Sequence, residues 1–249
     1  MIVRTDGDSL LLITQPDHAA LARRLMERWT SDGLPQSRRR ESILLAVGQH
    51  DNGWESVDAA PIVLPDGRIA DFVVAPGEVR RGVWPRAVAA LAADPYSAAL
   101  VAQHAVFVYG RFESDPEWTA FFDEMRALRE HHRVRAGVDA DILRRDYDFV
   151  RLGDLISLTF CNPWTDRQEH AGYRIIGDGT DLVIEPDPFA AERVRFEIRA
   201  RRLPNRRYRD ADDAKVAWNQ AEALSISGSI AGPSKTLTRS GGEHGETEY

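Results

Sequence analysis

The chain has 249 residues, of which 43% are hydrophobic and 29% are charged, so it is long and apolar enough to bury a core. This composition excludes a wholly disordered chain, and no apolar run approaches the roughly 20 residues that span a bilayer. The formal net charge of −7 argues against a protein dedicated to nucleic-acid binding. The single cysteine, Cys161, excludes an internal disulfide, and the first residues lack a signal-peptide pattern, so we expect a cytoplasmic protein.

The chain is predicted to open with a β-hairpin followed by helices. Residues 1–4 and 10–13 are apolar and flank a turn-forming Thr-Asp-Gly-Asp segment, which is typical of a hairpin. Apolar residues at helical spacing then predict a helix over residues 17–29 and a second one over 37–51. Residues 55–83 are punctuated by proline and glycine and predict an irregular excursion that covers or shapes a site.

Helical periodicity resumes and continues to Cys161, after which the period changes. Helices are predicted over residues 85–93, 96–111, 116–135 and 139–161. From Val194 to Ala200, apolar and charged residues alternate, which predicts a strand with one solvated face. Segments 173–176 and 182–184 are its expected hairpin partners, and a short helix is expected over 210–223.

These patterns together predict a mainly α protein: a helical bundle with a small antiparallel β portion formed by the N-terminus and residues 172–203. Four segments are expected. They are an N-terminal hairpin (1–15), a helical metal-binding domain (16–161), a β appendage with a short helix (162–224) and a disordered tail rich in Ser, Gly and Thr (225–249).

Ionisable side chains recur on the apolar faces of the predicted helices. For example, His18 lies three residues before Leu21, and His50 lies four residues after Ala46. A single inward histidine is usually a hydrogen-bonded core residue, but buried unpaired carboxylates are expensive. One or two divalent ions of manganese, iron, cobalt, nickel or zinc would satisfy imidazoles and carboxylates together. The predicted metal ligands are His18, His50, Asp51, His104, His132 and Asp154.

The order of His18, the adjacent pair His50-Asp51 and then Asp154, each on a separate helix, resembles the HD-domain superfamily, which is named for such a His-Asp pair. The resemblance covers residues 16–161 and implies a helical, metal-dependent phosphohydrolase in which these four residues bind the first metal. In members with two metals, two further histidines lie in the interval that His104 and His132 (or His131) occupy here.

The chain also resembles, over its whole length, a bacterial family of unassigned function. The segments that carry this resemblance are Gln15-Pro16-Asp17-His18, the block from His50 to Trp54 and the block from Gly153 to Leu158.

The expected function is a metal-dependent hydrolase of a small phosphorylated compound, a phosphomonoester or a nucleotide, that attacks with a metal-activated water. Asp51, His104 and His132 are its expected catalytic residues, and His104 or His132 acts as general acid if it is not a ligand. Asp58 or Glu55 is considered as an acceptor that orients a ligand histidine. The arginines considered for binding the phosphate are Arg111, Arg133, Arg135 and Arg151.

Two alternatives stay open. The first is a non-enzymatic nucleotide or metal sensor, or a structural protein in which the inward histidines form a satisfied polar core. The second is a di-iron oxygenase, an activity that a minority of the HD-domain superfamily has with the same ligands. Phosphate-loop, dinucleotide-binding, His-Glu-x-x-His and Gly-x-Ser-x-Gly motifs are all absent from the sequence.

Overall fold

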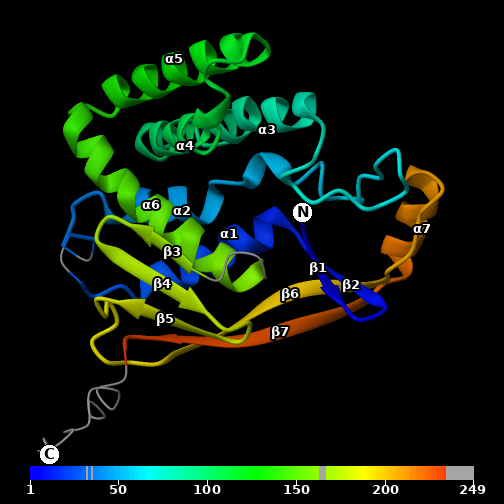
Figure 1. Cartoon of the computed structure of the whole chain (residues 1–249). Helices are drawn as coiled ribbons and strands as arrows, with labels where there is room; N and C mark the ends of the chain where they lie inside the picture. The colour runs from blue at the N-terminus through cyan, green and yellow to red at the C-terminus, as the bar shows by residue number, and fades with distance from the viewer. Residues whose placement is uncertain (32, 35, 163–166, 234–249) are drawn as a thin grey trace, which may run out of the picture.

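The computed structural model describes residues 1–31, 33–34, 36–162 and 167–233, and its architecture is mixed, with 48% helix and 21% strand (Figure 1). No helix in these ranges combines the length and the apolarity needed to cross a bilayer. Three short 3-10 helices, η1 (Asn52–Trp54), η2 (Gly110–Phe112) and η3 (Pro116–Trp118), accompany the longer ones. The α-helices of the described chain are α1 (Gln15–Glu27), α2 (Arg40–Gln49), α3 (Gly77–Ala90), α4 (Pro95–Val108), α5 (Thr119–Arg135), α6 (Ala140–Cys161) and α7 (Ala211–Gln220).

One curled, half-barrel sheet of seven strands joins both ends of the described chain, in the order β1-β2-β6-β7-β5-β4-β3. The N-terminal hairpin pairs through β2 with β6, and β7 lies between β6 (antiparallel) and β5 (parallel). The strands are β1 (Ile2–Asp6), β2 (Ser9–Ile13), β3 (Arg167–His170), β4 (Tyr173–Gly177), β5 (Asp181–Glu185), β6 (Val194–Pro204) and β7 (Glu222–Ala231).

The prediction of a mainly α, HD-like bundle with a small β portion is therefore wrong. The largest single cause is β7, which falls where a disordered tail was expected from residue 225. Leu224 and Ile226 alternate with serines along this strand and pack partly buried against the core, but the small residues between them hide the period of two. The rest of the predicted tail, residues 234–249, lies outside the described residues.

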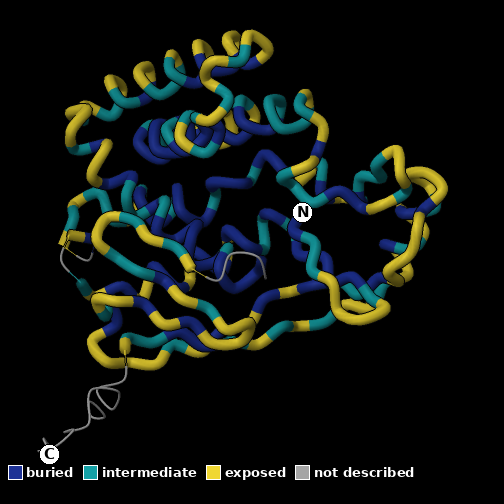
Figure 2. The backbone as a smooth tube through the Cα atoms, viewed as in Figure 1, coloured by how far each residue is buried: buried dark blue, intermediate teal, exposed yellow. Residues whose placement is uncertain are grey.

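Helices and sheet share one hydrophobic core, so the β portion is not an appendage. α1 packs on α2, α6 and β6, and α6 also lies along β3, β4 and β5. Buried positions occur both in the middle helices and in the sheet, while the outer face of α5 is exposed (Figure 2). Side chains from both layers, such as Leu21 of α1 and Ile198 of β6, belong to the same buried cluster. Burial of this shared apolar surface holds the ligand-bearing helices against the sheet.

A single residue, Thr14, separates β2 from α1, which fixes the position of His18. Thr14 caps the helix by accepting a hydrogen bond from the backbone N–H of Asp17 at 3.1 Å, and Pro16 occupies the first turn. His18 follows in that first turn, and its own N–H bonds to the Thr14 carbonyl at 3.0 Å. The sheet therefore fixes the position of the His18 imidazole.

A glycine allows α6 to approach α1 and α2 closely. A Cβ built on Gly153 would lie 2.8 Å from Val47 Cγ1 and 3.0 Å from Met26 Cγ, both shorter than ordinary van der Waals contact. Since Asp154 is the next residue, this close approach is what brings its carboxylate to the side chains of the other two helices.

Candidate metal centre

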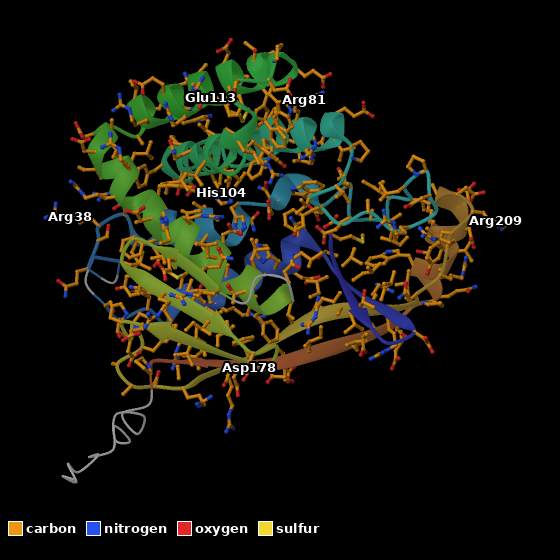
Figure 3. All side chains as sticks on the ribbon, viewed as in Figure 1. Arg38, Arg81, His104, Glu113, Asp178 and Arg209 are labelled. Carbon is orange, nitrogen blue, oxygen red and sulfur yellow. The ribbon has the colours of Figure 1, made fainter. Side chains whose placement is uncertain are left out.

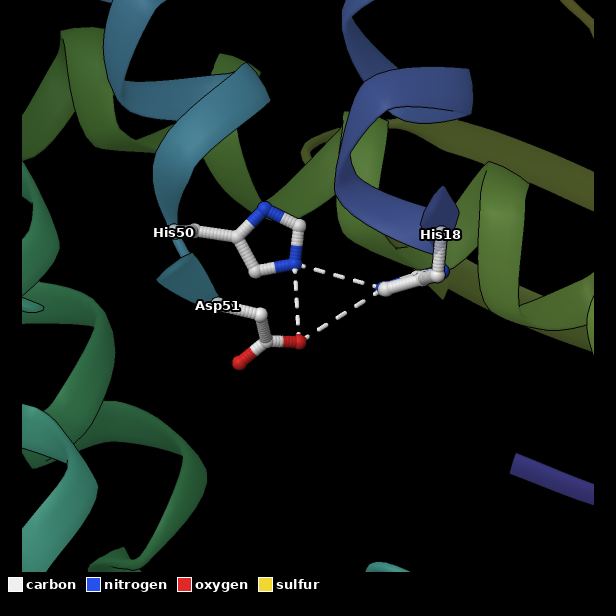
Figure 4. A group of neighbouring side chains, drawn as sticks. All are labelled: His18, His50 and Asp51. Carbon is white, nitrogen blue, oxygen red and sulfur yellow. Dashed lines mark hydrogen bonds and ion pairs between the residues drawn. The ribbon is translucent and has the colours of Figure 1, made fainter. Parts of the chain in front are cut away.

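Four buried side chains from three helical segments meet at one point. His18 projects from α1, His50 caps the C-terminal end of α2, Asp51 follows it, and Asp154 lies in α6. Both imidazoles are fully buried, and both carboxylates are nearly so. Figure 4 shows His18, His50 and Asp51 pointing toward one another, with each of their three mutual contacts drawn. The carbonyls exposed at the end of α2 add a negative potential at this point, which favours a cation.

The distances from the two imidazole Nε2 atoms to each other and to the two carboxylates fit one cation. The Nε2 atom of His18 lies 3.2 Å from Nε2 of His50, 3.1 Å from Oδ1 of Asp154 and 3.9 Å from Oδ2 of Asp51. The Nε2 atom of His50 lies 3.4 Å from Oδ2 of Asp51 and 3.5 Å from Oδ1 of Asp154. Ligand atoms arranged tetrahedrally at about 2.1 Å from a metal are about 3.4 Å apart, which is the middle of this range.

The other ring nitrogen of each histidine is held by a neighbour, which fixes the tautomer. Nδ1 of His50 donates to the Val47 carbonyl at 2.7 Å. Ser157 Oγ donates to the His18 carbonyl at 2.8 Å and so accepts from His18 Nδ1 at 2.7 Å. Both Nε2 atoms therefore present lone pairs to the common point, and two lone pairs 3.2 Å apart require a proton or a cation between them.

The electrostatics of the centre also favour positive charge. Burial lowers the pKa of His50, but the charge of Asp51 and the hydrogen bond to Asp154 outweigh it and raise that pKa to about 10. Burial opposes ionisation of Asp51, yet His50 brings the pKa of this carboxyl below its ordinary value. The pKa of Asp154 is likewise held well below its ordinary value, against its burial, by His18, His50 and Arg151. In the absence of a metal, a proton takes the place of the cation.

His104 lies beside the four residues rather than among them. It points from α4 toward the middle of the molecule (Figure 3), with its ring centroid 5.0 Å from that of His50 and its Nε2 3.8 Å from Asp154 Oδ2. His104, His50 and Asp154 form a second group whose ligand atoms are close enough to hold an ion. The Nδ1 atom of His104 is 3.1 Å from the Tyr147 hydroxyl, and burial lowers the pKa of His104 to about 3.

His132 is not brought to this centre. Within the described residues, neither ligand group contains it, and its ring contacts that of His131 at 5.1 Å. His132 lies in the last turn of α5 and His131 immediately before it, and α5 packs on α4. Asp58 does not orient a ligand histidine either, because its carboxylate binds the Met1 amine at 2.7 Å and the Gln15 backbone N–H at 2.6 Å. Glu55 is exposed.

A cavity of about 320 Å³ opens onto the centre. His18, Asp51, His104 and Asp154 line it, together with Phe72 and Val73 from the irregular excursion that precedes α3. Its walls also carry the aromatic side chains of Trp54, Trp84 and Tyr109 and three arginines, Arg80, Arg111 and Arg151.

Two of the four predicted phosphate-binding arginines, Arg111 and Arg151, line this cavity. Arg151 also bonds Asp154 Oδ2. Arg133 instead pairs with Glu130 on α5, and Arg135 is exposed. Arg80 was not among the predicted residues because the predicted helix begins at Pro85, whereas α3 begins at Gly77 and carries Pro85 inside it. With the correct start, Arg80 and Trp84 are four residues apart on one helical face.

The structure thus defines a protein with a buried His/Asp centre able to hold a divalent cation, at the base of an arginine-bearing cavity. The chain belongs to the family described as protein of unknown function (DUF3891), whose match spans residues 1–205. This confirms the resemblance to an uncharacterised family. Comparison with curated proteins and with solved structures found no match, and none of the comparisons supports membership of the HD-domain superfamily.

Proposed function

We propose that this protein is a metal-dependent hydrolase of a small phosphorylated compound. The observation that carries the proposal is a pair of buried imidazoles at ligand spacing from each other and from two carboxylates, beside a cavity that arginines also line. Neutral imidazoles with carboxylates suit manganese, iron, cobalt, nickel or zinc. The order of the ligands along the chain, which resembles the HD-domain superfamily, supports the same chemistry on a fold that is mixed rather than helical.

A cation bound at this centre supplies Lewis acidity, which lowers the pKa of water and withdraws charge from a phosphoryl oxygen. The chain's own residues bind the substrate and exclude water. Arg151 holds Asp154 in place with one part of its guanidinium and faces the cavity with the remainder, where it is placed to bind a phosphoryl oxygen. Trp54 and Trp84 are buried in the cavity wall and exclude bulk water from the reacting atoms.

His104 is better suited to ligation than to general acid catalysis. With a pKa of about 3, its imidazole is neutral at pH 7 and has no imidazolium proton to give to a leaving group. If its Nδ1–H donates to the Tyr147 oxygen, Nε2 presents a lone pair beside Asp154, as His18 and His50 do. We therefore assign His104 to the rim of the metal centre, as an additional ligand.

Metal content and phosphate-ester hydrolysis test the proposal on the full-length protein. We expect stoichiometric transition metal in the purified protein, its loss in His50→Ala and Asp51→Asn, and manganese-supported release of phosphate from at least one small ester. His131→Ala is the matched control, because this histidine is exposed and lies outside both ligand groups. Equal metal content in wild-type protein and both ligand variants refutes the centre. Metal binding without any ester hydrolysis supports a sensor and refutes the enzyme.

A further inference from the structure

Two arginines of the cavity are held by aromatic rings instead of carboxylates. The guanidinium carbon of Arg80 lies 5.2 Å from the ring centroid of Phe112, and that of Arg111 lies 4.7 Å from the same centroid. Phe112 in turn stacks on Trp118, with the rings 4.6 Å apart and 8° from parallel, and Arg80 also lies over Trp118. Cation–π contacts fix the direction of a guanidinium but leave its N–H donors free.

No acidic side chain of the described residues lies within ion-pair distance of either guanidinium. Among the described residues, neither Arg80 nor Arg111 makes an ion pair or a side-chain hydrogen bond, and the Nε atom of Arg80 is buried without an acceptor. The nearby carboxylates pair with other arginines: Glu117 is 3.9 Å from Arg81, and Glu113 pairs with Arg126. Two like charges beside one ring repel each other, and an anion between them would offset that repulsion.

The charge of the cavity exceeds what a single phosphate needs. A divalent cation is balanced by Asp51 and Asp154, and Arg151 already adds a positive charge next to them. Arg80 and Arg111 contribute two more positive charges at the Phe112 end of the cavity. Tyr109 lines the same cavity, and its pKa is raised to about 12 by burial and by Asp51, although Trp84, Arg80 and Arg111 lower it. Its phenol therefore keeps its proton and is a hydrogen-bond donor.

A second buried polar group in the same wall also lacks a partner. Gln15 is 2% exposed and lines the cavity, yet its Oε1 atom has no hydrogen-bond partner in the described chain. An unpaired buried acceptor is costly unless a ligand or water satisfies it. The cavity volume of about 320 Å³ is at the lower end of the roughly 300–1,000 Å³ found for small-molecule sites, which limits the ligand to a small one.

We propose that the substrate is a small phosphate ester with a second anionic group, a carboxylate or another phosphate, which Arg80 and Arg111 bind at the Phe112 end of the cavity. This inference rests on the proposed hydrolase for the placement of the first phosphate. Arg80 and Arg111 act as specificity-determining residues, since they select the doubly anionic ester and take no part in the reaction itself. Carboxylate and phosphate both accept paired hydrogen bonds from a planar guanidinium, so either anion can bind to these arginines in the same way.

Calorimetric binding of phosphonates, which cannot be hydrolysed, tests the proposal on the manganese-loaded protein. The probes are propylphosphonate, with one anionic group, and phosphonopropionate and propylene bisphosphonate, with two. We expect at least one of the doubly anionic probes to bind about tenfold or more tightly than propylphosphonate, because a charge-assisted hydrogen bond contributes about that factor. The probe that gains most shows whether the second group is a carboxylate or a phosphate.

Arginine variants then show which residues cause the tighter binding of the doubly anionic probes. Arg80→Gln and Arg111→Gln should each remove most of it and leave the affinity for propylphosphonate within about twofold. Arg81→Gln is the matched control, and Arg81 is labelled in Figure 3. Its guanidinium carbon also lies over Trp118, at 5.2 Å, but Arg81 does not line the cavity.

Three results overturn the proposal: equal binding of all three probes, binding of none, or a preference that survives when Arg80→Gln and Arg111→Gln are combined in one protein. Since no step of this assay requires turnover, a clear preference in a protein that hydrolyses no ester would refute the hydrolase and leave the anion subsite standing.

Discussion

Replacing Gly153 by alanine tests whether close packing of α6 builds the metal centre. The added methyl group would lie 2.8 Å from Val47 Cγ1 and 3.0 Å from Met26 Cγ, so α6 must move by a few tenths of an ångström. Overpacking of this kind costs about 1–3 kcal/mol, against a gain of about 1 kcal/mol from the better helix propensity of alanine. Because metal sites tolerate only about 0.2 Å in ligand distance, the movement of Asp154 should also weaken metal binding.

Gly82→Ala is the matched control. Gly82 lies inside α3, and a Cβ there would meet only the flexible end of Arg86 at 3.7 Å. This variant should therefore gain the stability that comes from the better helix propensity of alanine, with no cost of overpacking. The two variants should then differ by about 1–3 kcal/mol, or about 2–12 °C in Tm for a chain of this size. Thermal unfolding with and without added metal, beside elemental analysis, measures both effects. The reasoning fails if Gly153→Ala is as stable as Gly82→Ala and retains its metal.

Three further outcomes are expected. His132→Ala should retain the wild-type metal content, whereas His50→Ala should lose it; loss in both would show that α5 reaches the centre in solution. Ser157→Ala should lower metal affinity by about 10–100-fold by freeing the His18 tautomer, as measured by competition with a chelator, and an unchanged affinity would remove Ser157 from the argument. Because the metal-free pKa of His50 is about 10, metal binding should displace about one proton near pH 7, and affinity should rise about tenfold per pH unit up to that pKa. Calorimetry in buffers of different ionisation enthalpy counts this proton, and zero release would contradict the protonated state.

The helices were predictable from the sequence because an apolar stripe is a local property of the chain. The spacing predicted helices over 139–161 and 96–111, and α6 and α4 occupy nearly those positions. The sheet was not predictable to the same degree, since its order depends on partners far apart in sequence. β7 is a strand because β6 and β5 flank it, and a run of serine, glycine and isoleucine shows little of that by itself.

The same distinction explains the outcome for the site residues. Periodicity shows which face of a helix is buried, but not against which neighbour. His104 and His132 both lie on buried faces, yet α4 turns His104 toward α6 while α5 turns its buried face toward α4. Arg80 has a different explanation: proline is common in the first turn of a helix, so Pro85 predicts a helix start, although it lies inside α3.

The position of β7 has a consequence for biosynthesis. β7 is the last strand of the described chain to leave the ribosome, yet it lies in the interior of the sheet and separates β5 from β6. Until residue 231 has emerged, the nascent chain holds two partial sheets whose facing edges have unpaired backbone groups. The sheet therefore closes only after β7 has been translated, and a nascent chain stalled before this point would be prone to edge-to-edge aggregation.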